Sequence, residues 1–139
     1  MDLRPYSDAD RDACGALADR DFPARDRPAF ETFLASPGGP FFVMEHEGRV
    51  VGCGGYVMEA EDSLATLVWG MIRPEVRRQG LGRYLLMYCL REIGKAGGID
   101  RVRVETSKDV AGFYERQGFR VASINGDRVE LVKRLSVCS

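Results

Sequence analysis

One short stretch of this chain, residues 73–83, combines glycines and arginines immediately before a long amphipathic run. The first turn of a helix has four backbone N–H groups without intrahelical partners, and the helix dipole places partial positive charge there. Gly80 and Gly82 have no Cβ that would obstruct a ligand, so the backbone can close around an anion. Three arginines add positive charge and forked donors beside these amides: Arg77, Arg78 and Arg83. The stretch is therefore predicted to bind a phosphate or pyrophosphate group.

Two better-known phosphate loops do not fit this stretch. A Walker loop requires a lysine followed by Ser or Thr after its last glycine, and a dinucleotide-binding turn requires three glycines. What remains, Arg/Gln-x-x-Gly-x-Gly over residues 77–82, resembles the pyrophosphate-binding signature of the GNAT superfamily of acetyl-CoA-dependent N-acyltransferases. The alternative interpretation is an ordinary solvated basic turn at the start of a helix.

A second segment, residues 110–119, resembles the other signature of the same family. There a helix carries a Phe-Tyr pair, here Phe113 and Tyr114, and ends at Gly-Phe. Gly118 suits the position after a helix, because it can adopt the left-handed conformation that stops the helix, and Phe119 then begins a strand. Both signatures in this order, separated by one helix and one strand, favour the family over the solvated turn.

The resemblance implies how the coenzyme is held. In this family the strand before the loop splays from its neighbour, and its exposed backbone groups pair with the pantetheine arm of acetyl-CoA. The residues expected to bind the coenzyme are Met71, Ile72, Arg73, Arg77, Arg78, Gln79, Gly80, Leu81, Gly82, Arg83 and Ser107. Ser107 stands where many members carry an asparagine, so a hydroxyl of shorter reach replaces an amide.

Tyr114 matches the family's general acid, the phenol that protonates the departing coenzyme A thiolate. Its alternative role is that of a core aromatic on the same helical face as Phe113. Thr66 occupies the strand position at which histone-type members carry a basic carboxylate. That base is therefore missing, and a histone substrate is disfavoured.

Glu105 is the candidate general base, at the end of the strand expected to face the pantetheine cleft. Glu59, Glu61, a water relay or an acceptor that arrives as the free amine are alternatives. Glu105 is equally suited to a surface ion pair with Arg103 or Lys108.

Composition is consistent with a soluble cytoplasmic protein, either a monomer or a homodimer. The chain has 139 residues, a formal net charge of −1 and four cysteines without paired metal-ligand spacing, so no metal site is expected. No apolar run reaches the length of a membrane span, and the basic residues are not interleaved with aromatics as in nucleic-acid-binding proteins.

Residues 1–62 hold 13 acidic and 6 basic side chains, against 8 and 14 in residues 63–139. The basic part suits a coenzyme carrying phosphates, and the acidic part suits a cationic amine, unless solvated helix faces simply differ in sign.

Hydrophobic periodicity and turn residues divide the chain into alternating elements without a linker or a repeat. Strands are expected at residues 3–6, 41–46, 49–57, 64–72, 101–106, 119–124 and 128–134, and helices at 8–20, 27–35, 80–96 and 110–117. Helices between strands imply a parallel pair, and hairpins are expected at both ends. The predicted fold is a single α/β domain over residues 1–139: a GNAT-type, mostly antiparallel sheet with a central splayed parallel pair, helices on both faces and the order βααβββαβαββ. Trp69 either packs in the core or lines the acceptor pocket.

The resemblance thus predicts an enzyme that transfers an acetyl group from acetyl-CoA directly to a primary amine of a small acceptor. No cysteine adjoins a histidine that would activate it, so a covalent enzyme intermediate is not expected. Three alternatives remain: an acyltransferase of the same fold that uses a longer acyl-CoA, a non-catalytic acyl-CoA-binding regulatory module, and a different nucleotide-binding protein, which the missing Walker and dinucleotide motifs oppose. Tyr114 favours an enzyme over the regulatory module.

Overall fold

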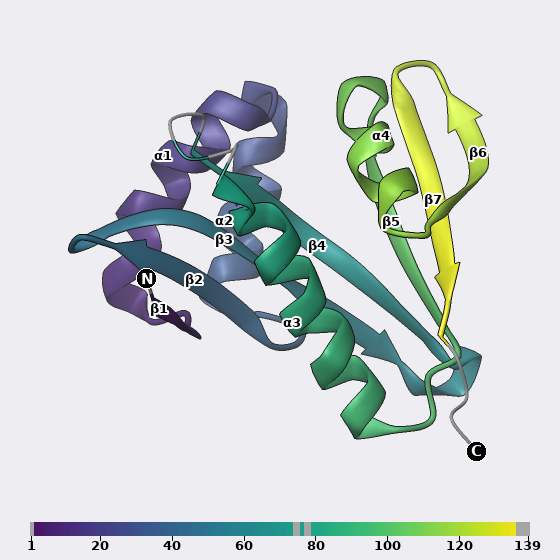
Figure 1. Cartoon of the computed structure of the whole chain (residues 1–139). Helices are drawn as coiled ribbons and strands as arrows, with labels where there is room; N and C mark the ends of the chain where they lie inside the picture. Colours follow the sequence, from purple (N-terminus) through teal and green to yellow (C-terminus); the bar gives the residue numbers. More distant parts are fainter. Residues whose placement is uncertain (1, 74–75, 77–78, 136–139) are drawn as a thin grey trace. The chain divides into compact units, whose positions relative to one another are not determined.

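The computed structural model describes residues 2–73, 76 and 79–135 (Figure 1). The strands are β1 (Asp2–Pro5), β2 (Phe41–His46), β3 (Arg49–Glu59), β4 (Leu64–Ile72), β5 (Arg101–Ser107), β6 (Arg120–Asn125) and β7 (Arg128–Arg134). The helices are α1 (Arg11–Asp21), α2 (Arg27–Ala35), α3 (Leu81–Ala96) and α4 (Lys108–Arg116), with short 3-10 turns at Asp8–Asp10, Ala24–Asp26 and Ala60–Asp62. The predicted order of strands and helices is confirmed.

The first helix begins later than its sequence pattern predicts. Ser7 is the cap, as expected, and its backbone N–H donates to the Asp10 carboxylate at 2.9 Å. The turn that follows, Asp8–Asp10, is a 3-10 turn, and α1 starts only at Arg11. Conversely, α4 starts two residues earlier than predicted, because Ser107 caps it directly at the end of β5.

The seven strands hydrogen-bond in the order β1-β2-β3-β4-β5-β7-β6. The pairs β1–β2, β2–β3, β5–β7 and β6–β7 are antiparallel. β4 and β5 form the parallel pair, in which Leu64–Thr66 lies beside Arg101–Arg103. The predicted class, a mixed and mostly antiparallel sheet with a parallel pair, is therefore confirmed.

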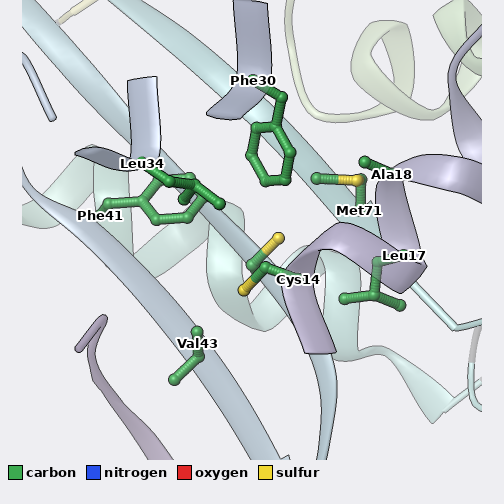
Figure 2. Close-up of a cluster of buried hydrophobic side chains, with 9 residues drawn as sticks. Cys14, Leu17, Ala18, Phe30, Leu34, Phe41, Val43 and Met71 are labelled. Carbon is green, nitrogen blue, oxygen red and sulfur yellow. The ribbon is translucent and has the colours of Figure 1, made fainter. Parts of the chain in front are cut away.

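The chain forms two compact units, residues 1–56 with 68–89, and residues 57–67 with 90–139. In the first unit, α1 and α2 cover one face of the strands (Figure 1). Figure 2 shows the core between them, where side chains from both helices meet side chains from β2, β3 and β4. The buried members of this cluster are Cys14, Leu17, Ala18, Phe30, Leu34, Phe41, Val43, Cys53 and Met71. The opposite face of the same strands carries the amino-terminal half of α3, because Phe42 packs edge-to-face on Tyr88 with ring centroids 5.1 Å apart.

A glycine permits the close approach of α3 to β3. A Cβ on Gly54 would lie 3.0 Å from the Leu85 Cδ2 and 3.3 Å from the Gly70 Cα. A side chain at this position would therefore push the helix away from the strands. The contact therefore sets how closely the first turns of α3 lie on β3.

In the second unit, α4 lies against the strands β5, β7 and β6 (Figure 1). Alternate residues of β5 and β7 are buried beneath it: Val102, Val104, Val129 and Leu131. Because strand side chains alternate between faces, the residues between them lie on the face away from α4. The positions of α4 and Glu105 within this unit follow from that alternation.

Trp69 interrupts β4 with a left-handed backbone, φ +51°. Its indole packs on aromatic rings from the α1–α2 region, with ring centroids 5.3 Å from Phe22 and 4.8 Å from Phe30. Trp69 is half-buried against the core cluster. The sequence left open whether it packs in the core or lines the acceptor pocket, and these contacts support packing in the core. A non-glycine residue in this conformation costs about 1–3 kcal/mol, which the aromatic contacts offset.

Candidate functional site

The start of α3 has the backbone geometry of an anion site. Gly80 has a φ of +76°, and its carbonyl accepts the first helical hydrogen bond, from the Tyr84 N–H at 3.0 Å. The N–H groups of Leu81, Gly82 and Arg83 precede that bond and therefore have no acceptor within the helix. A Cβ on Gly80 would meet nothing within 4 Å, so the space beside this residue is open.

Some side chains at the start of α3 are buried and others are exposed to solvent. Leu81 is buried and holds the first turn in the core, whereas Gln79 and Arg83 are exposed. Arg77 and Arg78, predicted to contact the same anion, lie outside the described residues. Arg83 is therefore the described cation nearest in sequence to the first turn.

An open pocket of about 320 Å³ lies along the same helix and is lined by Gly80, Arg83, Tyr84 and Met87. Tyr84 is 53% exposed and Met87 39% exposed, which is unusual for side chains of this size. Neither residue is among those predicted from the sequence to line the site. Helical periodicity could have shown that both are exposed, since they fall outside the apolar stripe of Leu81, Leu85 and Cys89 that the helix buries.

The end of β4 is tightly held to β3. Met71 is buried, and Arg73 donates its N–H to the Val51 carbonyl at 2.7 Å and its Nε–H to the Val50 carbonyl at 3.3 Å. The Arg73 carbonyl accepts from the Val76 N–H at 3.1 Å. Both backbone groups of Arg73 thus have partners inside the protein, and a ligand would reach only the second lone pair of its carbonyl.

Tyr114 lies on α4 with its ring fixed between two others. The ring centroids of Phe113 and Phe119 are 5.1 and 5.4 Å away, both edge-to-face. The Tyr114 carbonyl accepts the N–H of Gln117 at 2.9 Å and that of Phe119 at 3.1 Å, which ends the helix. The side chain is half-buried, so its position combines the packing role with partial access to solvent.

Ser107 is the last residue of β5 and the cap of α4. Its hydroxyl makes no capping hydrogen bond to the helix, although serine is a preferred residue at this position. The hydroxyl is therefore not committed to closing the helix.

Glu105 lies on the face of β5 that points away from α4, since it is flanked by the buried Val104 and paired across the ladder with Glu130. Its carboxylate is 3.7 Å from the Arg103 guanidinium and 3.4 Å from that of Arg128. The pair with Arg103 is one of the two surface ion pairs that the sequence offered as the alternative to a base, whereas Arg128 takes the place of the other predicted partner, Lys108. Tyr114 and Glu105 thus belong to opposite sides of the strands in this unit.

The perturbed carboxyl groups have structural causes. The hydrogen bond from Arg4 holds the pKa of Asp10 below its usual value, against the effect of burial. Arg103 does the same for Glu130. Burial raises the pKa of the Cys53 thiol well above its usual range, with the neighbouring Cys14 adding to the shift. Cys53 is therefore protonated at neutral pH and unsuited to nucleophilic attack.

Within the described ranges there is no group of three or more histidine, cysteine, aspartate or glutamate side chains arranged to hold a metal ion. Over the same residues, none of the helices has the length and apolar character needed to span a membrane.

Comparison with known proteins identifies the class that this fold belongs to. A family model described as an acetyltransferase (GNAT) domain matches residues 37–121, which is more than half of the chain. The chain therefore belongs to the GNAT acetyltransferase family.

Among curated sequences, the chain is 29% identical over 112 residues to the uncharacterized N-acetyltransferase YjgM of Escherichia coli, covering 76% of this chain and 66% of that protein. It is 30% identical over 89 residues to an IAA acetyltransferase of Azospirillum brasilense, covering 62% of this chain and 58% of that protein. An amino-acid acetyltransferase of Vibrio atlanticus matches over only 18% of its own length. The chain thus spans two thirds or less of the length of these relatives.

Solved structures share the fold. The ribosomal-protein-S18-alanine N-acetyltransferase of Escherichia coli superposes with a TM-score of 0.80 at 21% identity, over 99% of this chain and 96% of that one. An aminoglycoside 6′-N-acetyltransferase complexed with coenzyme A gives a TM-score of 0.79 at 13% identity, over 96% and 97% of the two chains.

Proposed function

We propose that this chain is an N-acetyltransferase that moves an acetyl group from acetyl-CoA directly to a primary amine. Membership of the GNAT family supports the reaction class. The observation that carries the coenzyme assignment is the start of α3, where Gly80 at φ +76° leads into three N–H groups without helical acceptors. Residues 1–139 act in this proposal as one acetyltransferase domain.

The coenzyme's pyrophosphate is assigned to the first turn of α3, with Arg83 and the predicted Arg77 and Arg78 balancing its charge. The pantetheine arm is assigned to the end of β4 at Met71 and Ile72. Arg73 contributes less to binding of the pantetheine arm, because its backbone N–H and carbonyl already have hydrogen-bond partners within the protein. Ser107, whose hydroxyl is not used in capping, contributes a donor to the same coenzyme.

The reaction proceeds by attack of the neutral amine nitrogen on the thioester carbon. The carbon–sulfur bond breaks, and the electron pair leaves on the coenzyme A sulfur as a thiolate. Tyr114 supplies the proton that turns this thiolate into the free thiol. The two flanking aromatic rings hold the phenol in place, which lowers the cost of orienting the proton donor.

The proton released by the amine goes either to Glu105, the base predicted from the sequence, or to water. The ion pairs of Glu105 with Arg103 and Arg128, and its position on the face away from α4, favour water. Glu105→Gln separates the two routes. If Glu105 is the base, the variant should lower the rate about 100- to 10,000-fold. If water accepts the proton, the variant loses only exposed ion pairs, which changes the free energy of unfolding by less than about 1 kcal/mol and leaves the rate unchanged.

The acceptor is proposed to be a small amine and the location cytoplasmic. The experiment is a screen of amine acceptors with acetyl-CoA, in which the released thiol is detected optically, repeated with longer acyl-CoA donors. Thiol release with acetyl-CoA and an amine, but not with water alone, is expected. Faster release with longer donors would favour the acyltransferase alternative. Binding of acetyl-CoA without thiol release across the panel would favour the regulatory module.

A further inference from the structure

The face of β5, β7 and β6 that points away from α4 carries five arginines, and we call it the arginine face. They are Arg101, Arg103, Arg120, Arg128 and Arg134, accompanied by two glutamates, Glu105 and Glu130. The side chains of this face are exposed or half-exposed. It therefore carries an excess of positive charge in a unit whose other side is covered by α4.

The strand register brings four of the arginines together. Arg101 pairs directly with Arg134 across β5 and β7, and Arg103 and Arg120 flank Val132 in the next row. Same-face neighbours lie about 4.8 Å apart across strands and about 6.8 Å apart along one. Like charges directly opposite each other destabilise a strand pair. The Arg101–Arg134 pair therefore places two positive charges side by side on this face, where an additional anion would be stabilising.

Some arginines of the face already bind carboxylates within the protein. Arg103 donates to the Glu130 carboxylate, and Arg128 donates to that of Glu105 at 3.4 Å. Arg101 also reaches the Asp62 carbonyl at 2.7 Å and the Asp100 carboxylate at 3.2 Å. Arg120 and Arg134 have no such contact with the described residues. Two guanidinium groups thus remain available beside others already paired with carboxylates.

We propose that the arginine face is a docking surface for an extended acidic segment of a partner protein. In an extended peptide, alternate side chains are about 6.8 Å apart, which matches the spacing of the arginine rows. A guanidinium pairs with a carboxylate through two parallel hydrogen bonds, as the planar fork favours.

Other occupants fit less well. The face carries no aromatic side chain on which a nucleotide base would stack. A second copy placed face to face would bring two positive surfaces together. The register of β6 shifts between Val121 and Ser123, and such a bulge interrupts an edge and discourages strand addition. The partner therefore lies on the face and does not extend the sheet.

The test is fluorescence anisotropy with a labelled twelve-residue peptide of alternating glutamate and serine, at low salt. The double variant Arg120→Gln/Arg134→Gln should raise the Kd at least about tenfold, since two charge-assisted contacts are lost. The matched control is Lys95→Gln/Arg116→Gln, which removes the same charge from α3 and α4 and should change the Kd less than about twofold. Circular dichroism and acetyl-CoA binding establish that both variants are folded.

Equal weakening in both double variants would overturn the proposal, because binding would then follow net charge alone. So would absence of peptide binding to the unmodified protein at 50 mM salt. Tighter binding of an oligothymidylate of the same charge would replace the acidic peptide by a nucleic acid. Dimerisation in sedimentation velocity that is abolished by Arg120→Gln/Arg134→Gln would assign the face to a second copy of the chain.

Discussion

Gly80 and Gly97 stand at the two ends of α3 and allow the anion site to be separated from helix stability. Gly80 precedes the helix with φ +76°, and Gly97 follows it with φ +74°. A Cβ at either position would meet nothing within 4 Å. Alanine at either position therefore encounters no steric clash, and the left-handed backbone alone costs about 1–2 kcal/mol. Urea denaturation should show this loss of unfolding free energy in both Gly80→Ala and Gly97→Ala.

The two variants should differ in their affinity for acetyl-CoA. The Cβ of Gly80→Ala adds bulk at the residue that directly precedes the first-turn N–H groups, to which the pyrophosphate is assigned. Loss of one charge-assisted hydrogen bond, about 1.5–3 kcal/mol, raises the Kd about ten- to a hundredfold. Gly97→Ala changes the opposite end of a 16-residue helix, about 24 Å away, and its Kd should stay within about twofold.

Isothermal titration calorimetry with acetyl-CoA at a temperature where both variants are fully folded measures the difference. An unchanged Kd in Gly80→Ala would remove the pyrophosphate from the start of α3. An equal rise of the Kd in both variants would show that binding depends on the stability of α3 as a whole, and the argument from the first-turn amides would be refuted.

Three further predictions concern single side chains. Tyr114→Phe should lower kcat about 100- to 10,000-fold at an unchanged Kd for acetyl-CoA, measured by stopped-flow thiol release; full turnover would reduce the tyrosine to a packing role. Asp10→Asn should destabilise the protein by about 1–2 kcal/mol at pH 7, because the Arg4 guanidinium loses its buried carboxylate partner. The pKa of Asp10 is lowered in the folded state, so its stabilisation exists above the unfolded value near 4 and is lost as the pH falls through the folded value; denaturation curves of the variant and the unmodified protein should converge once the pH lies below the folded pKa. Cys14, Cys53 and Cys89 are buried thiols, so a thiol-specific reagent at pH 7 should react with them only at the rate of unfolding, and rapid labelling of these three under native conditions would contradict the packing.

The fold was predictable because its elements carry strong local signals. The boundaries of β2, β4 and β7 agree with those expected from alternation and turn residues. Two of the errors lie beside a capping residue: Asp10 accepts the Ser7 N–H in a 3-10 turn before α1, and Ser107 caps α4 directly at the end of a strand. The bounds of β1 and β3 also differ from those expected, by one or two residues. The left-handed Trp69 could not be predicted, because its conformation depends on aromatic rings from a distant part of the chain.

The candidate site was predictable to a smaller extent. The left-handed backbone at Gly80 could be expected from the residue type, since a positive φ at the start of a helix favours glycine. Sequence spacing does not say which side of a strand a residue occupies relative to a following helix, and the side that Glu105 occupies bears on its predicted role as proton acceptor. In the structure, Val102 and Val104 lie beneath α4, so the odd-numbered residues of β5 point away from the helix that carries Tyr114. The Glu105 carboxylate therefore lies on the arginine face, and the rate of Glu105→Gln tests whether it also serves as the proton acceptor in the proposed reaction.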